Sequence, residues 1–210
     1  MSTYTVSLEP ASEDDLALFA QWWNNCKIAD GCRKEVDPLP AEDNIERFRI
    51  WCHEESDSGF GYAIRNQEGL CVGCISAWGI ADPERDATLS IMVGPYYQGH
   101  GYGSQALTIA LHRLHDMRVA TITVRVAAHN LRARHMFAER GFREIDRMQH
   151  AIERDGKPLD IIVMRASAED AVKTLWQDNP YDDSVQLIPR RNIFRCLLYT
   201  SDAADDMQCV

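Results

Sequence analysis

The segment that most constrains this chain is residues 88–107, TLSIMVGPYYQGHGYGSQAL, in which an apolar run of β-forming residues ends at a Gly-Pro pair. A glycine-rich loop follows, and after it the apolar residues recur with helical period. Glycine at positions 99, 101 and 103 lets the backbone approach a ligand with no Cβ in the way. The start of the helix adds unpaired backbone N–H groups and the positive end of the helix dipole. The segment therefore predicts a strand, a loop and a helix that together bind a pyrophosphate group.

Spacing separates the phosphate-binding motifs that this loop could represent. A Rossmann fingerprint counted from Gly99 needs glycine where this chain has Ser104, and no acidic ribose partner is evident about twenty residues further on. A Walker A loop needs a Gly-Lys-Ser/Thr run, and the loop contains no lysine. The pattern that remains is Gln-x-x-Gly-x-Gly, which begins at Gln98 and ends at Gly103.

This pattern resembles the acyl-CoA pyrophosphate loop of the GNAT superfamily of N-acetyltransferases. A second segment, residues 130–142, is similar to the family signature Asn-x-x-Ala-x-x-Leu-Tyr-Glu-Lys-x-Gly-Phe. The closing stretch, residues 155–164, resembles the branch that contains ribosomal-protein N-terminal acetyltransferases and spermidine acetyltransferases. The resemblance covers residues 4–165. The residues of the second signature that match in register are Asn130, Ala133, Gly141 and Phe142.

The resemblance implies an acetyl-CoA-dependent N-acetyltransferase that needs no metal. It would move an acetyl group from acetyl-CoA to a primary amine, either a small cationic amine or a peptide N-terminus, by direct transfer in a ternary complex. In the family, backbone groups at the end of the fourth strand pair with the pantetheine arm, the loop amides bind pyrophosphate, and an asparagine lies on the far side of the arm. The positions that correspond here are Met92, Val93, Gln98, Gly99, His100, Gly101, Gly103, Ser104 and Asn130.

The chain departs from the family pattern at one position. Where the family commonly has a tyrosine that protonates the CoA thiolate, this chain has Phe137, which has no proton to give. Water or the substrate ammonium would then protonate the thiolate, or another group would do so. Tyr96, Tyr97 and His135 are the nearest candidates in the sequence, and of these we take Tyr97 as the candidate catalytic residue. The same departure motivates an alternative function, a CoA-binding regulatory module with weak or no transferase activity.

The general base is less constrained than the cosubstrate site. Glu84 and Asp86 precede or begin the strand that would face the thioester, and a carboxylate there could deprotonate the amine directly or through water. A solvated loop carboxylate is the alternative interpretation of both residues. Deprotonation without any dedicated residue also remains open.

Periodicity and turn signals predict an α/β fold. The resemblance makes it a GNAT-type mixed, largely antiparallel central sheet, with a splay between the fourth and fifth strands and helices at its flanks. We expect an acetyltransferase domain at 1–166, a partly helical C-terminal extension at 167–195, and a tail at 196–210 that resembles a translated DNA-library adapter. Strands are expected near 4–8, 60–65, 70–80, 87–93, 120–127, 143–153 and 158–165, and helices near 12–23, 41–53 and 168–176, with two more helices after the glycine loop and after Asn130.

Composition limits the partners and the compartment. A net charge of −10 favours a cationic partner and disfavours nucleic acid. No apolar run reaches the roughly 18 residues of a membrane helix, and the polar N-terminus lacks a signal-peptide core, so we expect a cytoplasmic monomer or homodimer. Cys71 and Cys74 lie three apart on a predicted strand, which would place them on opposite faces as buried small residues rather than metal ligands.

The first two helices and their connector contain acidic and aromatic residues that could bind the amine, because this region covers the acceptor groove in relatives. Glu13, Asp14 and Asp15 have a simpler explanation at the N-terminus of a helix, where acidic side chains are stabilising. Of Trp22 and Trp23 we expect only one to be core, because adjacent helical positions do not both face inward.

Overall fold

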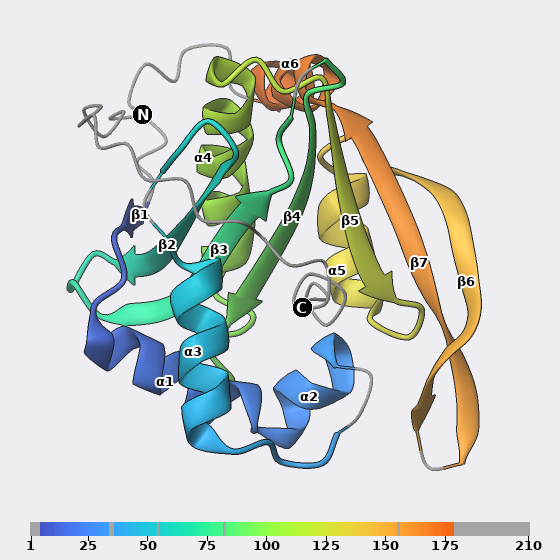
Figure 1. The fold of residues 1–210 in the computed structure, drawn as a ribbon. Helices are drawn as coiled ribbons and strands as arrows, with labels where there is room; N and C mark the ends of the chain where they lie inside the picture. Colours follow the sequence, from blue (N-terminus) through green and yellow to red (C-terminus); the bar gives the residue numbers. More distant parts are fainter. Residues whose placement is uncertain (1–4, 34–35, 54, 82, 155, 179–210) are drawn as a thin grey trace.

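The computed structural model describes residues 5–33, 36–53, 55–81, 83–154 and 156–178 (Figure 1). Its centre is a seven-stranded sheet with the order β1-β2-β3-β4-β5-β7-β6. The strands are β1 (Val6–Glu9), β2 (Gly59–Asn66), β3 (Cys71–Trp78), β4 (Asp86–Val93), β5 (Thr121–Ala127), β6 (Arg143–Arg154) and β7 (Lys157–Ser167). The helices are α1 (Glu13–Trp23), α2 (Cys26–Cys32), α3 (Ala41–Trp51), α4 (Tyr102–Asp116), α5 (Leu131–Ala138) and α6 (Ala168–Asp178).

The sheet is antiparallel except between β4 and β5. These two strands are parallel, and they separate toward their carboxyl ends. The two parallel strands pair only at their first residues, from Asp86 opposite Thr121 to Thr88 opposite Thr123. Beyond this point each strand continues toward its carboxyl end without the other, and Figure 1 shows them diverging. The predicted mixed sheet with a splay between the fourth and fifth strands is confirmed.

Helices cover both faces of the sheet (Figure 1). On one face α4 and α5 pack on a large apolar cluster that includes Ile91, Leu107 and Phe137. On the other face α1 and α3 form a second cluster rich in aromatic rings. The short helix α2, which the sequence analysis did not predict, packs against β5 near the open end of the splay.

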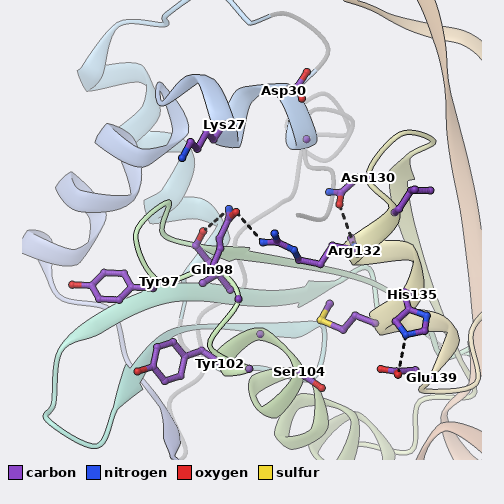
Figure 2. A pocket seen from close by; sticks show the side chains of 18 of the residues that line it. Lys27, Asp30, Tyr97, Gln98, Tyr102, Ser104, Asn130, Arg132, His135 and Glu139 are labelled. Atoms are coloured by element: carbon purple, nitrogen blue, oxygen red, sulfur yellow. Dashed lines mark hydrogen bonds and ion pairs between the residues drawn. The ribbon is translucent and has the colours of Figure 1, made fainter.

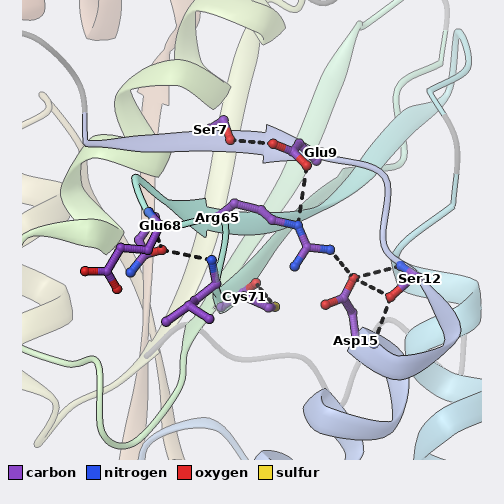
Figure 3. Close-up of polar contacts among 10 residues, drawn as sticks. Ser7, Glu9, Ser12, Asp15, Arg65, Glu68 and Cys71 are labelled. Carbon is purple, nitrogen blue, oxygen red and sulfur yellow. Dashed lines mark hydrogen bonds and ion pairs between the residues drawn. The ribbon is translucent and has the colours of Figure 1, made fainter.

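The first helix begins at a capping box that Ser12 and Asp15 form. Ser12 N donates to Asp15 Oδ2 at 2.8 Å, and Asp15 N donates to Ser12 Oγ at 3.2 Å. Arg65 of β2 extends this network, with its Nη2 2.6 Å from Asp15 Oδ2 (Figure 3). Burial raises the pKa of Asp15, but the hydrogen bonds from Ser12 and Arg65 outweigh it, so the pKa lies below its usual range. Asp15 therefore joins α1 to the sheet, as a structural carboxylate rather than an amine ligand.

The expectation that only one of the paired tryptophans is core was wrong. Both Trp22 and Trp23 are buried, because α1 is covered by the sheet on one side and by α3 on the other. A Cβ on Gly94 would lie 2.7 Å from the Trp22 ring, which shows how closely that ring meets the end of β4. Trp23 packs edge-on against the Trp51 ring of α3 at 5.5 Å.

Cys71 and Cys74 are buried, as expected, but they share one apolar cluster instead of lying on opposite faces. The pairing of β2 with β3 shifts register between Ile64 and Arg65, which leaves Val72 as an extra residue. This bulge reverses the alternation of side chains along β3. Burial raises the pKa of the Cys71 thiol to about 12, so the group is an inert core residue.

The predicted helix at 168–176 corresponds to α6, which begins directly after β7 ends at Ser167, while the predicted domain boundary at 166 stays a prediction. The remainder of the predicted extension and the tail at 196–210 lie outside the described residues. None of the helices in the described ranges has the length and apolar character that crossing a membrane requires.

Candidate active site

A cavity of about 600 Å³ occupies the open end of the splay. Val93 at the end of β4, the glycine loop and the first turn of α4 form one part of its wall. The turn after β5 and the helix α5 form a second part, and α2 contributes Lys27, Asp30 and Gly31 from a third direction. Figure 2 shows Lys27 and Asp30 on the opposite side of this cavity from Tyr102 and Ser104.

The glycine loop has the backbone conformation that its sequence predicts. Gly99 and Gly101 have φ values of 84° and 80°, in the left-handed region that residues with a side chain rarely adopt. Gly101 is the N-cap of α4 and provides no side-chain hydrogen bond to the helix. The first turn of α4 therefore presents its backbone N–H groups and the positive end of its dipole at the cavity wall.

Polar side chains brace the loop against the two neighbouring helices. Gln98 Nε2 donates to the Val93 carbonyl at 3.3 Å, and Arg132 Nη1 of α5 donates to Gln98 Oε1 at 3.3 Å. Arg140 Nη2 donates to Ser104 Oγ at 3.0 Å. Asn130 caps α5, because its Oδ1 accepts from Ala133 N at 3.1 Å. These contacts hold the loop, α4 and α5 in one arrangement.

Seven of the nine positions expected to bind acetyl-CoA line the cavity, and two do not. The side chain of Met92 is buried in the aromatic cluster on the α1 and α3 face. His100 lies outside the cavity wall, with its Nδ1 3.1 Å from the Tyr97 carbonyl and its ring stacked on Tyr102. The positions that line the cavity are Val93, Gln98, Gly99, Gly101, Gly103, Ser104 and Asn130.

The two carboxylates considered as general base lie at the other end of the sheet. Glu84 is in the exposed turn before β4, and Asp86 is the first residue of that strand. Asp86 is about 23 Å of extended strand away from Val93, at about 3.3 Å for each residue. Its Oδ1 accepts a hydrogen bond from the Thr121 hydroxyl. The structure does not bring either carboxylate to the cavity.

The positions considered for thiolate protonation also differ from the expected arrangement. Tyr97 lines the cavity, but Figure 2 shows its ring extending away from Gln98 and Arg132, with the hydroxyl at the far end. That ring packs edge-on against Trp22 at 6.0 Å. Phe137 is fully buried and packs against Phe142 at 5.3 Å, so its ring is part of the core rather than of the cavity wall.

Two features of the site were not predicted from the sequence, namely the short helix α2 and the pairing of its Asp30 with His129 of the turn after β5. His129 Nε2 lies 3.3 Å from Asp30 Oδ2, and Asp30 Oδ1 accepts from Arg154 Nε at 3.1 Å. A cap at Asn25, whose Oδ1 accepts from Lys27 N at 3.0 Å, was the available signal for a short helix at this point. Asp30 is separated in the sequence by 99 positions from His129 and by 124 positions from Arg154. No local pattern in a single sequence indicates contacts over such separations.

On the α5 side, His135 Nε2 pairs with Glu139 Oε1 at 3.1 Å. Over the described part of the chain, no three histidine, cysteine, aspartate or glutamate side chains are arranged to hold a metal ion.

Residues 5–143 match the family model for the acetyltransferase (GNAT) domain. With the splayed sheet and the glycine loop at its open end, this match shows that the chain belongs to the GNAT family, and it is an acetyl-CoA-dependent N-acetyltransferase.

Solved structures share the fold at low sequence identity. Spermidine N-acetyltransferase from Vibrio cholerae in complex with CoA and spermine is 20% identical with a TM-score of 0.69, over 80% of this chain and 98% of that one. A protein named as a proposed phosphinothricin N-acetyltransferase is 21% identical with a TM-score of 0.67, over 78% of this chain and 98% of that one. A complex of the Vibrio cholerae spermidine/spermine enzyme with manganese ions is 18% identical, with a TM-score of 0.63, over 80% and 96%. No curated protein matches the chain.

Proposed function

We propose that this protein transfers the acetyl group of acetyl-CoA to a small cationic primary amine in a ternary complex. The observation that carries the proposal is the cavity at the splay, which has a glycine-lined anion cradle at one side and the carboxylate of Asp30 at another. A peptide N-terminus is the other acceptor of the same chemical class. No step of the proposed reaction involves Glu84, Asp86 or Tyr97. Neither carboxylate lies at the cavity, and the Tyr97 ring packs against Trp22.

The wall of the cavity fits the donor. Left-handed glycines and a helix start without a side-chain cap suit a pyrophosphate group, which accepts hydrogen bonds from backbone N–H groups. Arg132 of α5 and Lys27 of α2 add positive charge at other parts of the cavity wall. In our proposal the edge of β4 that has no partner strand at Val93 would supply backbone groups to the pantetheine arm, as the resemblance implies.

The charge of the cavity and of the whole chain favours a cationic acceptor. Asp30 and Glu139 line the cavity, and the whole chain has a net charge of −10, so a cationic amine is attracted both at long range and at the site. The similar Vibrio cholerae structure contains spermine, which makes polyamines the first acceptors to test. Aminoglycosides and peptides with a free N-terminus are the next.

The reaction requires few side chains because the thioester is already activated. The amine nitrogen attacks the thioester carbon, the C–N bond forms, and the C–S bond breaks. One proton must leave the ammonium before attack, and a second passes from the nitrogen to the departing sulfur. Because no tyrosine stands at position 137, we propose that the second proton comes from the attacking nitrogen or from water.

The test is a free-thiol assay with a panel of amines, combined with mass spectrometry of the products and calorimetry of CoA binding. Turnover with a polyamine or another cationic amine, and acetylated product of the expected mass, support the proposal. The buried phenylalanine at position 137 keeps the regulatory alternative open. CoA binding without turnover on any amine would support that alternative and reject the proposed function.

A further inference from the structure

Two ionisable side chains from distant parts of the chain meet at the wall of the cavity. His129 follows β5 and Asp30 belongs to α2, and their Nε2 and Oδ2 atoms are 3.3 Å apart. The side chain of His129 is 30% exposed and that of Asp30 is 53% exposed, so both remain accessible from the cavity. A histidine with a carboxylate on one nitrogen is the usual arrangement of a positioned base.

Arg154 fixes the carboxylate from the other side. Its Nε donates to Asp30 Oδ1 at 3.1 Å, and its Nη2 donates to the backbone carbonyls of Ala29 and Asp30 at 3.1 and 3.0 Å. The Arg154 side chain is only 10% exposed. One oxygen of Asp30 is thus held by Arg154, while the other faces the His129 ring. The last turn of α2 is held by the same contacts.

We propose that His129 is the general base that removes a proton from the acceptor ammonium, and that Asp30 is the positioning residue that orients its ring. The inference rests on the proposed function. With Nε2–H donating to the Asp30 carboxylate, the lone pair is at Nδ1, and that atom takes the proton. Asp30 also stabilises the imidazolium that forms.

The location of His129 in the fold supports this role. It lies just beyond the carboxyl end of β5, while Val93 marks the carboxyl end of β4, so the two residues stand on opposite sides of the splay. The His129 imidazole would therefore lie across the cavity from a thioester that the backbone at Val93 holds. Among the described residues that line the cavity, the other histidine, His135, has a 76% exposed side chain on α5 and pairs with Glu139.

The proton balance of the step is complete. His129 Nδ1 accepts one proton from the ammonium, and the neutral amine attacks the thioester carbon. A second proton goes from the nitrogen to the sulfur, so the products are the acetylated amine, free CoA thiol and an imidazolium. The imidazolium releases its proton to water when the products leave. No oxidant or metal enters the balance.

Several charged groups lie near the pair formed by His129 and Asp30 and will influence the pH dependence of the reaction. Asp30 and Lys27 belong to α2, and Arg154 belongs to β6. From α5, Arg134 donates to the carbonyl of Ala128, next in the chain to His129, at 3.1 Å. The pH dependence of kcat/KM will therefore reflect this whole group of charges and not the imidazole alone.

The decisive experiment is the pH profile of kcat/KM for the wild type and for His129→Gln, with spermidine or, if it is not acetylated, the panel amine with the fastest turnover. The wild type should show a limb that rises with pH and that is absent from the variant. At neutral pH the variant should lose about 100-fold in kcat/KM, within the usual contribution of a general base. Its dissociation constant for CoA should change less than twofold.

Two further variants separate chemistry from structure. His129→Ala should regain activity when imidazole is added, in proportion to the unprotonated form of the imidazole. His115→Gln changes a histidine that also neighbours an aspartate, 3.8 Å away, but at the far end of α4, and it should keep the wild-type profile.

An unchanged profile in His129→Gln, or failure of imidazole to rescue an His129→Ala enzyme that still binds CoA, would overturn the inference while leaving the proposed function intact. Absence of turnover by the wild type with every amine would instead reject the proposed function.

Discussion

Gly103 lies directly against Val93: a Cβ built on the glycine would be 3.2 Å from Cγ2 of the valine. This contact joins the first turn of α4 to the end of β4, the two elements whose backbones bound the cavity. A larger residue at either position would push the helix away from the strand. The absence of a side chain at 103 therefore lets α4 pack closely against the end of β4, while Gly99 and Gly101 set the path of the loop.

A valine at Gly101 should abolish measurable CoA binding, since position 101 combines a left-handed backbone, φ 80°, with a place in the cavity wall. Gly69→Val is the matched control, because Gly69 has φ 76° and no atom within 4 Å of an added Cβ, in the turn between β2 and β3. Both changes should cost about 1–2 kcal/mol of stability from backbone strain. Calorimetry of CoA binding should distinguish them, and equal binding by both variants would contradict the assignment of the loop.

Phe137→Tyr should not increase kcat. The ring is fully buried against Phe142, so the added hydroxyl enters the apolar core and not the cavity. An unsatisfied buried hydroxyl costs about 1–3 kcal/mol, which thermal or urea unfolding would detect. Phe137→Leu serves as control, because it disturbs packing without adding a polar group. A rise in kcat for the tyrosine variant would show that thiolate protonation limits the rate after all.

Removal of the Tyr97 hydroxyl should leave kcat within about threefold, well short of the 100-fold or greater effect of losing a general acid. The Tyr97 ring packs on Trp22, and its hydroxyl points away from the residues around Gln98. Tyr96→Phe is the control, since Tyr96 is 82% exposed and does not line the cavity. A loss of 100-fold in Tyr97→Phe alone, with CoA binding preserved, would make Tyr97 the proton donor.

Asp15→Asn should destabilise the fold by about 3 kcal/mol, as expected when one partner of a buried ion pair is removed. Asp15 is 2.6 Å from Arg65 and its side chain is only 6% exposed. Glu13→Gln on the same helical turn should cost less than about 1 kcal/mol, because Glu13 is 75% exposed in its pair with Arg49.

At low pH, Asp15→Asn and the wild type should have the same free energy of unfolding. The pKa of Asp15 is lower when folded, so the pair contributes fully above the unfolded pKa of about 3.9 and its contribution is lost as pH falls through the folded value. Urea unfolding at pH 7 and below pH 4 measures this. A gap between variant and wild type that stays constant with pH would show that the charge of Asp15 is not what stabilises α1.

The sequence by itself determined the parts of this protein that depend on neighbours along the chain. The helix that starts near Ser12 and the glycine loop at 99–103 were both predicted, because turn conformation and helix starts follow from local backbone chemistry. The mixed, largely antiparallel sheet with a splay between its fourth and fifth strands followed from the resemblance, and the structure confirms it.

Only the tertiary structure decided which side chains meet at the cavity. It separated Glu84 and Asp86 from Val93 by most of a strand, placed Phe137 in the core, and joined Asp30 to His129 across 99 residues. It also buried both Trp22 and Trp23, because α1 packs against α3 as well as against the sheet. Such contacts depend on how helices and strands pack in three dimensions, and no local pattern in a single sequence encodes that packing.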